Sequence, residues 1–238
     1  MKLVLFDIDG TILTASGAGR RALEQALHEV YGTAGPIDRY DFRGGTDLLI
    51  IRELMRMAGL ANHVVVAGEE RLFARYAERL ATEIGDGQGV RLYPGVAALV
   101  ERLAGSPGCV VGLLTGNSEA GARIKLRPTG LWPRFRFGAY GTDHEDRDRL
   151  PAVAAARAEA LVGRPFRGAD TVVIGDTPRD IGCARAFGAR AIAVATGWHG
   201  LDDLHAHGPD HLFPDLGDVD RVAAAILDGG APDGRGAR

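Results

Sequence analysis

Short apolar runs that alternate with longer helical segments constrain the fold of this chain more than any other feature. The runs have the length of β-strands, and residues with apolar side chains at helical spacing separate them. This alternation predicts an α/β fold, with a doubly wound parallel sheet covered by helices on both faces. The expected strands are residues 2–6, 110–114, 135–140, 171–174 and 190–194.

A long insertion separates the first expected strand from the second. Its apolar residues recur at helical spacing over residues 20–30, 48–58 and 69–84, with no strand-like run among them. Glycine-rich segments border the insertion on both sides. We therefore expect an all-helical cap over residues 15–91, an α/β core made of residues 1–14 and 92–230, and a flexible tail over residues 231–238.

Charge and hydrophobicity exclude several classes of protein. A formal net charge of -3 over 238 residues leaves no basic excess for binding nucleic acid or an anionic membrane surface. The apolar stretches are too short to cross a bilayer, and no signal-peptide core precedes the first strand. We expect a cytoplasmic monomer or homodimer whose two cysteines, Cys109 and Cys183, are free thiols.

Polar residues follow three of the expected strands at the point where each strand ends. In an open parallel sheet, ligands bind outside the carboxyl ends of the strands, so these residues are candidates for a shared site. They are Asp7 and Asp9 after the first strand, Thr115, Gly116 and Asn117 after the second, and Asp176 and Asp180 after the fourth.

The carboxylates among these residues favour a metal site. Asp7 and Asp9 are two apart in extended chain, so their side chains can point to the same side. Two close carboxylates repel each other at neutral pH unless a cation lies nearby. With Asp176 they form an all-oxygen ligand set that suits Mg²⁺ better than zinc, which prefers histidine and cysteine.

Each motif also has a purely structural interpretation. The segment from Thr177 to Asp180 has the pattern of a helix start, with Pro178 at the first helical position. Either Asn117 or Ser118 would serve as the N-cap of a helix over residues 120–126, and residues 9–11 would form a turn. None of these interpretations explains why all the motifs fall at strand ends on one edge of the expected sheet.

The residues at these strand ends resemble the motifs of a known superfamily. Residues 5–13, Leu-Phe-Asp-Ile-Asp-Gly-Thr-Ile-Leu, resemble the first motif of the haloacid dehalogenase-like hydrolases. Residues 114–117 resemble the second motif and residues 173–180 the fourth, in matching order and spacing. The resemblance spans Lys2 to about Leu227, and the helical insertion is similar to the C1-type cap of the phosphoglycolate phosphatase-like members.

The resemblance implies a Mg²⁺-dependent phosphatase acting on a small phosphorylated metabolite of the phosphoglycolate or sugar-phosphate type. Asp7 would be the nucleophile that forms an aspartyl-phosphate, and Asp9 the general acid and base. The resemblance further implies Mg²⁺ ligands at Asp7, the backbone carbonyl of Asp9 and Asp176, with Asp180 as a ligand or orienting residue, and phosphate binding by Thr115, Gly116 and Asn117.

One motif departs from the pattern of the superfamily. A lysine commonly precedes a proline there, but residues 143–151 contain no lysine. We hypothesise that Arg147 supplies the positive charge, with Arg149 as the alternative, unless both are solvated residues of a charged loop. Lys125 is the nearest lysine, and we expect it at the surface of the helix after the second motif.

The sequence leaves other functions to be weighed. The presence of Asp9 disfavours dehalogenation, because that reaction has no alkoxide leaving group to protonate. A phosphonatase would require a lysine from the cap, and residues 15–92 contain none. A phosphomutase of the β-phosphoglucomutase type and a catalytically inactive binding protein with the same fold remain alternatives.

Substrate recognition is expected from the cap. Residues 17–20 and 42–47 are the segments that we expect to face the site, where Arg20 and Arg43 would bind a substrate carboxylate or second phosphate unless they are simply solvated. His205, His207 and His211 lie in a stretch that reads as a loop, and we do not expect a metal there.

Overall fold

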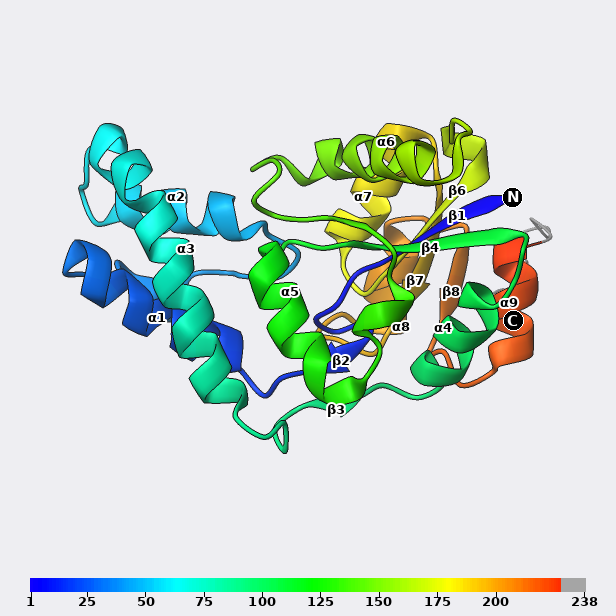
Figure 1. Ribbon diagram of the computed structural model, residues 1–238, viewed down its shortest axis with the longest axis horizontal. Coiled ribbons are helices and arrows are strands. Elements are labelled where there is room, and N and C mark those ends of the chain that lie inside the picture. The colour runs from blue at the N-terminus through cyan, green and yellow to red at the C-terminus, as the bar shows by residue number, and fades with distance from the viewer. Residues whose placement is uncertain (228–238) are drawn as a thin grey trace.

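The computed structural model describes residues 1–227, so the expected tail at 231–238 and the last residues of the expected core lie outside the described residues. A six-stranded sheet forms the centre of the molecule (Figure 1). Its strands are β1 (Lys2–Phe6), β4 (Cys109–Leu114), β5 (Gly138–Ala139), β6 (Thr171–Gly175), β7 (Arg190–Val194) and β8 (His211–Phe213).

The strand order is β5-β4-β1-β6-β7-β8, and every neighbouring pair is parallel. β1 therefore lies in the interior of the sheet, and the strands that precede the second and fourth motifs, β4 and β6, flank it. This order places three of the predicted motif loops side by side at one edge of the sheet. The predicted α/β class with a parallel sheet is confirmed.

Helices cover both faces of the sheet and form the inserted segment. They are α1 (Ala18–Tyr31), α2 (Asp47–Met57), α3 (Asn62–Ile84), α4 (Val96–Ala104), α5 (Glu119–Leu126), α6 (Leu150–Val162), α7 (Pro178–Phe187), α8 (Leu201–Ala206) and α9 (Val219–Leu227). Short 3₁₀ turns are η1 (Ile37–Arg39), η2 (Arg127–Thr129), η3 (Trp132–Arg134), η4 (Arg147–Arg149) and η5 (Gly168–Asp170).

Alternating side chains of β1 enter two separate cores. Val4 and Phe6 belong to the core under α4 and α9, whereas Leu3 and Leu5 belong to the core under α6 and α7. Successive residues of a strand point to opposite faces, and here both faces are covered, so the strand reads as a continuous apolar run.

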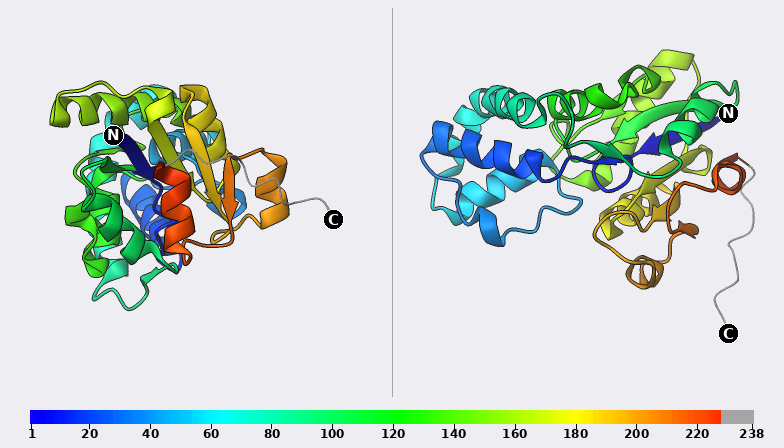
Figure 2. Two further views of the ribbon diagram at one scale, coloured as in Figure 1. Left: turned by 90° about the vertical axis from the view of Figure 1, so that its right-hand side faces the viewer. Right: turned by 90° about the horizontal axis from the view of Figure 1, so that it is seen from below.

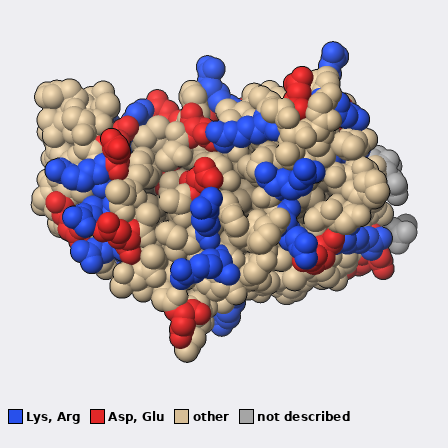
Figure 3. All heavy atoms as spheres, viewed as in Figure 1, with Lys and Arg blue, Asp and Glu red and all other residues tan. Residues whose placement is uncertain are grey.

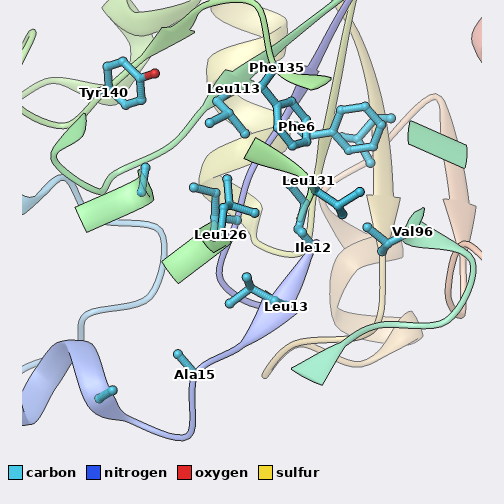
Figure 4. Packing of buried hydrophobic residues seen from close by; sticks show 14 of the residues in the cluster. Phe6, Ile12, Leu13, Ala15, Val96, Leu113, Leu126, Leu131, Phe135 and Tyr140 are labelled. Carbon is cyan, nitrogen blue, oxygen red and sulfur yellow. The ribbon is translucent and has the colours of Figure 1, made fainter. Parts of the chain in front are cut away.

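The edge of the sheet at β5 differs from the prediction. The sequence predicts a strand over residues 135–140, but only Gly138 and Ala139 have strand geometry. Phe135 instead turns into the core, where its ring packs edge-on against Phe6 with centroids 6.1 Å apart (Figure 4). The apolar run over residues 135–140 therefore contains a strand of two residues and, before it, a phenylalanine that is buried without being part of the strand.

The stretch that carries His205 and His207 is also more regular than predicted. The sequence predicts a loop, but α8 begins at Leu201 and β8 begins at His211. His211 is buried beside Phe213, with the two rings stacked. Short elements rich in polar residues carry too little periodicity for the pattern to reveal them.

The helices α1, α2 and α3 lie together at one end of the molecule, away from the amino terminus, in Figure 1 and in the right-hand view of Figure 2. They follow β2 (Leu13–Thr14) and precede β3 (Arg91–Leu92), and these two strands pair antiparallel. The inserted helical cap is confirmed as part of the fold, while the boundary at residues 15 and 91 stays a prediction.

Basic and acidic side chains are interspersed over the face drawn in Figure 3, with no broad field of one sign. Within residues 1–227, no helix combines the length and the apolar character that a membrane span requires.

Candidate active site

The first motif continues β1 into a tight turn. The amide of Asp7 donates to the carbonyl of Ile174, so Asp7 stays aligned with β6 and its carboxyl group is buried. Asp9 follows two residues later and is more exposed. Gly10 has φ +87°, a conformation that favours glycine, and turns the chain back toward Leu13.

Three buried carboxylates converge at the strand ends. Asp7, Asp176 and Asp180 each offer an oxygen atom, and these atoms lie within 4.8 Å of one another. Burial raises the pKa of Asp7 to about 6 against the lowering effect of Arg147. Burial and the charges of Asp180 and Asp7 also raise the pKa of Asp176 well above its usual range. This all-oxygen cluster fits a divalent metal ion, which would relieve the repulsion.

Two glycines, Gly10 and Gly197, lie close to the carboxylate of Asp176. A Cβ on Gly10 would lie 2.1 Å from the Oδ2 atom of Asp176, and one on Gly197 would lie 1.8 Å from the same atom. Thr11 donates its hydroxyl to the other oxygen, Oδ1, at 3.0 Å. Gly197 is not among the residues singled out from the sequence, because its role depends on its contact with Asp176, which lies on another loop.

Arg147 lies inside the site and Arg149 lies outside it. The side chain of Arg147 is 6% exposed, and its Nη2 atom is 3.3 Å from Asp7 and 2.5 Å from Asp180. The side chain of Arg149 is 70% exposed and pairs only with Asp146, at 3.8 Å. Of the two candidates, the structure therefore brings Arg147 to the acidic cluster.

Asp180 also holds the start of α7. Its carboxylate accepts hydrogen bonds from the backbone and hydroxyl of Thr177, and Thr177 caps the helix in return. The helix-start interpretation of this motif is thus correct, and the same carboxylate also faces Arg147. Both oxygens of Asp180 are engaged in this way.

The second motif forms the loop between β4 and α5. Thr115 is buried, and its Oγ1 atom accepts hydrogen bonds from the side-chain and backbone nitrogens of Asn117. The amide of Asn117 also donates to Oδ2 of Asp9 at 2.8 Å. Ser118, the other candidate, is the N-cap of α5, so Asn117 is left to bridge the first and second motifs.

Lys125 is not at the surface, and this prediction is wrong. Its side chain is 6% exposed, and its Nζ atom donates to Oδ2 of Asp9 and to Oδ1 of Asn117, both at 2.7 Å. Lys125 follows Ser118 by two helical turns and thus lies on the same face of α5, and its long side chain reaches back toward the start of the helix. That spacing is the signal that the sequence analysis overlooked.

The segment over residues 42–47 reaches the second motif, as predicted. The amide of Asp47 donates to the carbonyl of Gly116 at 2.7 Å, and the amide of Ser118 donates to Asp47 at 2.7 Å. Thr46 donates its hydroxyl to the carbonyl of Glu145 at 2.7 Å. The start of α2 is therefore bound to the loops of the site.

The two arginines considered for substrate binding are engaged elsewhere. Arg20 donates to Asp38 at 2.6 Å, and Arg43 donates to Asp41 at 2.7 Å. Within residues 1–227, neither arginine makes a hydrogen bond or ion pair with a motif residue. Among residues 1–227, the acidic cluster is the one group with the composition of a metal site, so the three histidines stay outside it.

Comparison with known proteins agrees with this geometry. A family model for haloacid dehalogenase-like hydrolases matches residues 1–188. A phosphoglycolate phosphatase of Synechococcus elongatus is 29% identical over 230 residues, which cover 95% of this chain and 99% of that protein. One of Yersinia pseudotuberculosis is 26% identical over 219 residues, covering 91% and 90%.

A solved structure shows the same fold. The crystal structure of a hydrolase from Pseudomonas syringae has a TM-score of 0.70 and 21% identity, and covers 95% of this chain and all of that one. The chain therefore belongs to the haloacid dehalogenase-like hydrolase family. Within this family it is a phosphatase, similar to the phosphoglycolate phosphatases.

Proposed function

We propose that this phosphatase hydrolyses a small phosphomonoester, of the phosphoglycolate or sugar-phosphate type, through an aspartyl-phosphate on Asp7. The observation that carries the proposal is the position of Asp7, which is buried in the acidic cluster with Asp176 and Asp180 and lies 3.3 Å from Arg147. The names of the relatives from Synechococcus and Yersinia support phosphoglycolate as the first substrate to try.

In the proposed mechanism, a carboxylate oxygen of Asp7 attacks phosphorus and the bond to the leaving oxygen breaks. Asp9 gives its proton to that oxygen, so the alcohol leaves neutral. Asp9 then takes a proton from water, which attacks phosphorus and releases phosphate and the free carboxylate of Asp7. Asn117 and Lys125 both hold Oδ2 of Asp9, which leaves Oδ1 for these transfers.

The remaining residues of the site would bind the phosphoryl group or balance its negative charge. Thr115 and the backbone amides of Gly116 and Asn117 would bind the transferring phosphoryl oxygens, and Arg147 would balance the charge of Asp7 and the phosphate. Mg²⁺, held by Asp7, the backbone carbonyl of Asp9 and Asp176, would neutralise charge between the carboxylate and the phosphate. The engaged oxygens of Asp180 favour an orienting role over direct ligation.

The experiment that tests the proposal is phosphate release from a panel of small phosphomonoesters, with Mg²⁺ and with EDTA. Wild type should need Mg²⁺, and Asp7→Asn should lose all turnover because the amide is not a nucleophile. Asp38→Asn is a matched control, since Asp38 is an exposed aspartate of the 3₁₀ turn η1 that pairs with Arg20. Turnover by Asp7→Asn at the wild-type rate would overturn the assignment.

The same panel separates the alternatives. Release of the phosphate to water from every productive ester supports a phosphatase, whereas isomerisation of a sugar phosphate without release would indicate a phosphomutase. Absence of both reactions would favour a binding protein. A cytoplasmic location and a monomeric or homodimeric state stay predictions from the sequence.

A further inference from the structure

Lys125 is a second buried cation at the site, and it lies outside the motif segments. Arg147 pairs with Asp7, whereas Lys125 pairs with Asp9. Its helix, α5, packs against α3 of the cap (Figure 1). A Cβ on Gly19 of α1 would lie only 3.3 Å from the Nζ atom of Lys125, so a second cap helix also packs closely over the ammonium group.

Asp9 depends on such partners because burial alone does not hold it. Its side chain is 47% exposed, so a carboxylate without partners here would rotate freely. The Nδ2 atom of Asn117 and the Nζ atom of Lys125 both donate to one oxygen, Oδ2, at 2.8 and 2.7 Å. Two donors on the same oxygen fix the orientation of the carboxylate before a substrate arrives, which lowers the cost of reaching the reactive geometry.

Lys125 also determines which way the amide of Asn117 faces. An ammonium group only donates hydrogen bonds, so the amide atom that faces Lys125 must be the oxygen, and Oδ1 of Asn117 accepts at 2.7 Å. This orientation turns Nδ2 toward Asp9 and toward Oγ1 of Thr115, at 2.8 Å from each. With the amide reversed, its oxygen would face the carboxylate of Asp9, and two acceptors repel each other. Both contacts that hold Asp9 therefore depend on Lys125.

We propose that Lys125 is a positioning residue for the general acid, which holds Asp9 directly and through the orientation of Asn117. The inference rests on the proposed function, in which Asp9 protonates the leaving oxygen. Because Lys125 acts on Asp9 and not on the nucleophile, its removal should slow those reactions that need a proton on the leaving group.

The test compares two esters whose leaving groups differ in their need for a proton. Glycerol 3-phosphate releases an alkoxide that must be protonated, whereas 4-nitrophenyl phosphate releases a stabilised phenolate that leaves without a proton. Neither ester carries a charge besides the phosphate, so the loss of a cation should weaken the binding of both alike. Lys125→Met should lower kcat/KM for glycerol 3-phosphate about a hundredfold and that for 4-nitrophenyl phosphate far less.

Arg123→Met is the matched control. Arg123 lies on the same helix, but its side chain is 63% exposed and pairs with Glu119 at 3.6 Å. This variant also removes one positive charge from α5, and it should leave both kcat/KM values unchanged.

Lys125→Gln is the second probe, which keeps a polar group in case Lys125→Met does not fold. An amide both donates and accepts, so glutamine would no longer force Asn117 into one orientation. The same selective loss on glycerol 3-phosphate should therefore appear. Should wild type not accept glycerol 3-phosphate, the fastest alkyl ester of the panel without a second charge takes its place.

Asp9→Asn separates this inference from the proposed function. It should show the same selective loss; if it slows both esters equally or neither, the assignment of Asp9 as the acid fails, and the role of Lys125 with it. A selective loss in Asp9→Asn but in neither Lys125 variant would overturn the role of Lys125 alone. Equal losses on both esters in the Lys125 variants would also overturn it, because a lysine that only supports the fold affects both reactions.

Discussion

Arg147 is the single residue on which most of the charge balance at the site depends. Its guanidinium is buried between Asp7 and Asp180, and its Nη1 atom donates to the carbonyl of Gly44. The group holds a fixed charge at every pH at which the protein is folded. It therefore offsets carboxylate repulsion and fixes the loop at Gly44 at the same time.

Replacing Arg147 with alanine should leave buried carboxylates without their cation and destabilise the protein by about 3–5 kcal/mol. Turnover should fall to background, since the phosphate also loses a positive partner. Urea denaturation and phosphate release measure the two effects.

Arg149→Ala is the control for this change. Its side chain is exposed and weakly paired, so stability should stay within about 0.5 kcal/mol of wild type. Comparable losses in the two variants would show that Arg147 acts as an ordinary loop residue.

From the sequence, Arg147 was the favoured residue and Arg149 the alternative, and the pattern of residues alone could not separate the two. Arg147 and Arg149 lie two apart in the 3₁₀ turn η4, where three residues complete a turn, so they must point in different directions. Which direction faces the site depends on how η4 docks against α7, and this is a tertiary contact. Lys125 was misjudged for the same reason, because α5 is covered by α3.

The elements that build the site are loops at strand ends, and their glycines set how closely they approach. Three of the motif loops were predictable because the strands that precede them are continuous apolar runs. Gly197, in the loop after β7, was not, because its importance comes from Asp176 on a neighbouring strand. Contacts between loops that are distant in sequence leave no periodic signal.

Gly197→Ala should therefore displace the carboxylate of Asp176, because the added methyl carbon would lie 1.8 Å from its Oδ2 atom. We expect a loss of about 1–3 kcal/mol in stability and at least about tenfold in kcat/KM. Equilibrium unfolding and a Mg²⁺ titration of the activity measure these changes.

Gly200→Ala is the companion variant in the same segment. A Cβ on Gly200 meets nothing within 4 Å, and its φ of -78° suits any residue. Its activity and stability should match those of wild type. Equal behaviour of the two variants would mean that the loop yields and that Asp176 needs no such close support.

At the scale of the whole molecule, Asp47 links the helical segment to the second motif. It accepts a hydrogen bond from the amide of Ser118, and burial raises the pKa of its carboxyl group to about 6 despite the nearby charge of Lys125. A carboxyl group with a raised pKa in the folded state stabilises the protein most below its unfolded value of 3.8.

This stabilisation should be lost as the pH rises through about 6, by about 3 kcal/mol in total. Asp47→Asn keeps an oxygen that accepts the hydrogen bond from Ser118 but cannot ionise. The free energy of unfolding of this variant should therefore increase relative to that of wild type between pH 4 and pH 7. Urea denaturation across this range measures the difference.

Parallel pH profiles for the two proteins would contradict the raised pKa of Asp47. Asp38→Asn is again the appropriate control, because Asp38 is exposed and should not alter the profile. The overall arrangement of sheet and inserted helices was predictable from the alternation of runs, whereas the contacts of Asp47 required the packed structure.

The chain contains only two lysines, and their different surroundings have a practical consequence. Lys125 is enclosed by Asp9 and Asn117, while Lys2 lies at the opposite end of β1 and contacts the carbonyl of Ala169. Reagents that couple to side-chain amines should thus react at Lys2. A support loaded in this way would hold every molecule in one orientation, with the catalytic edge turned toward the solution.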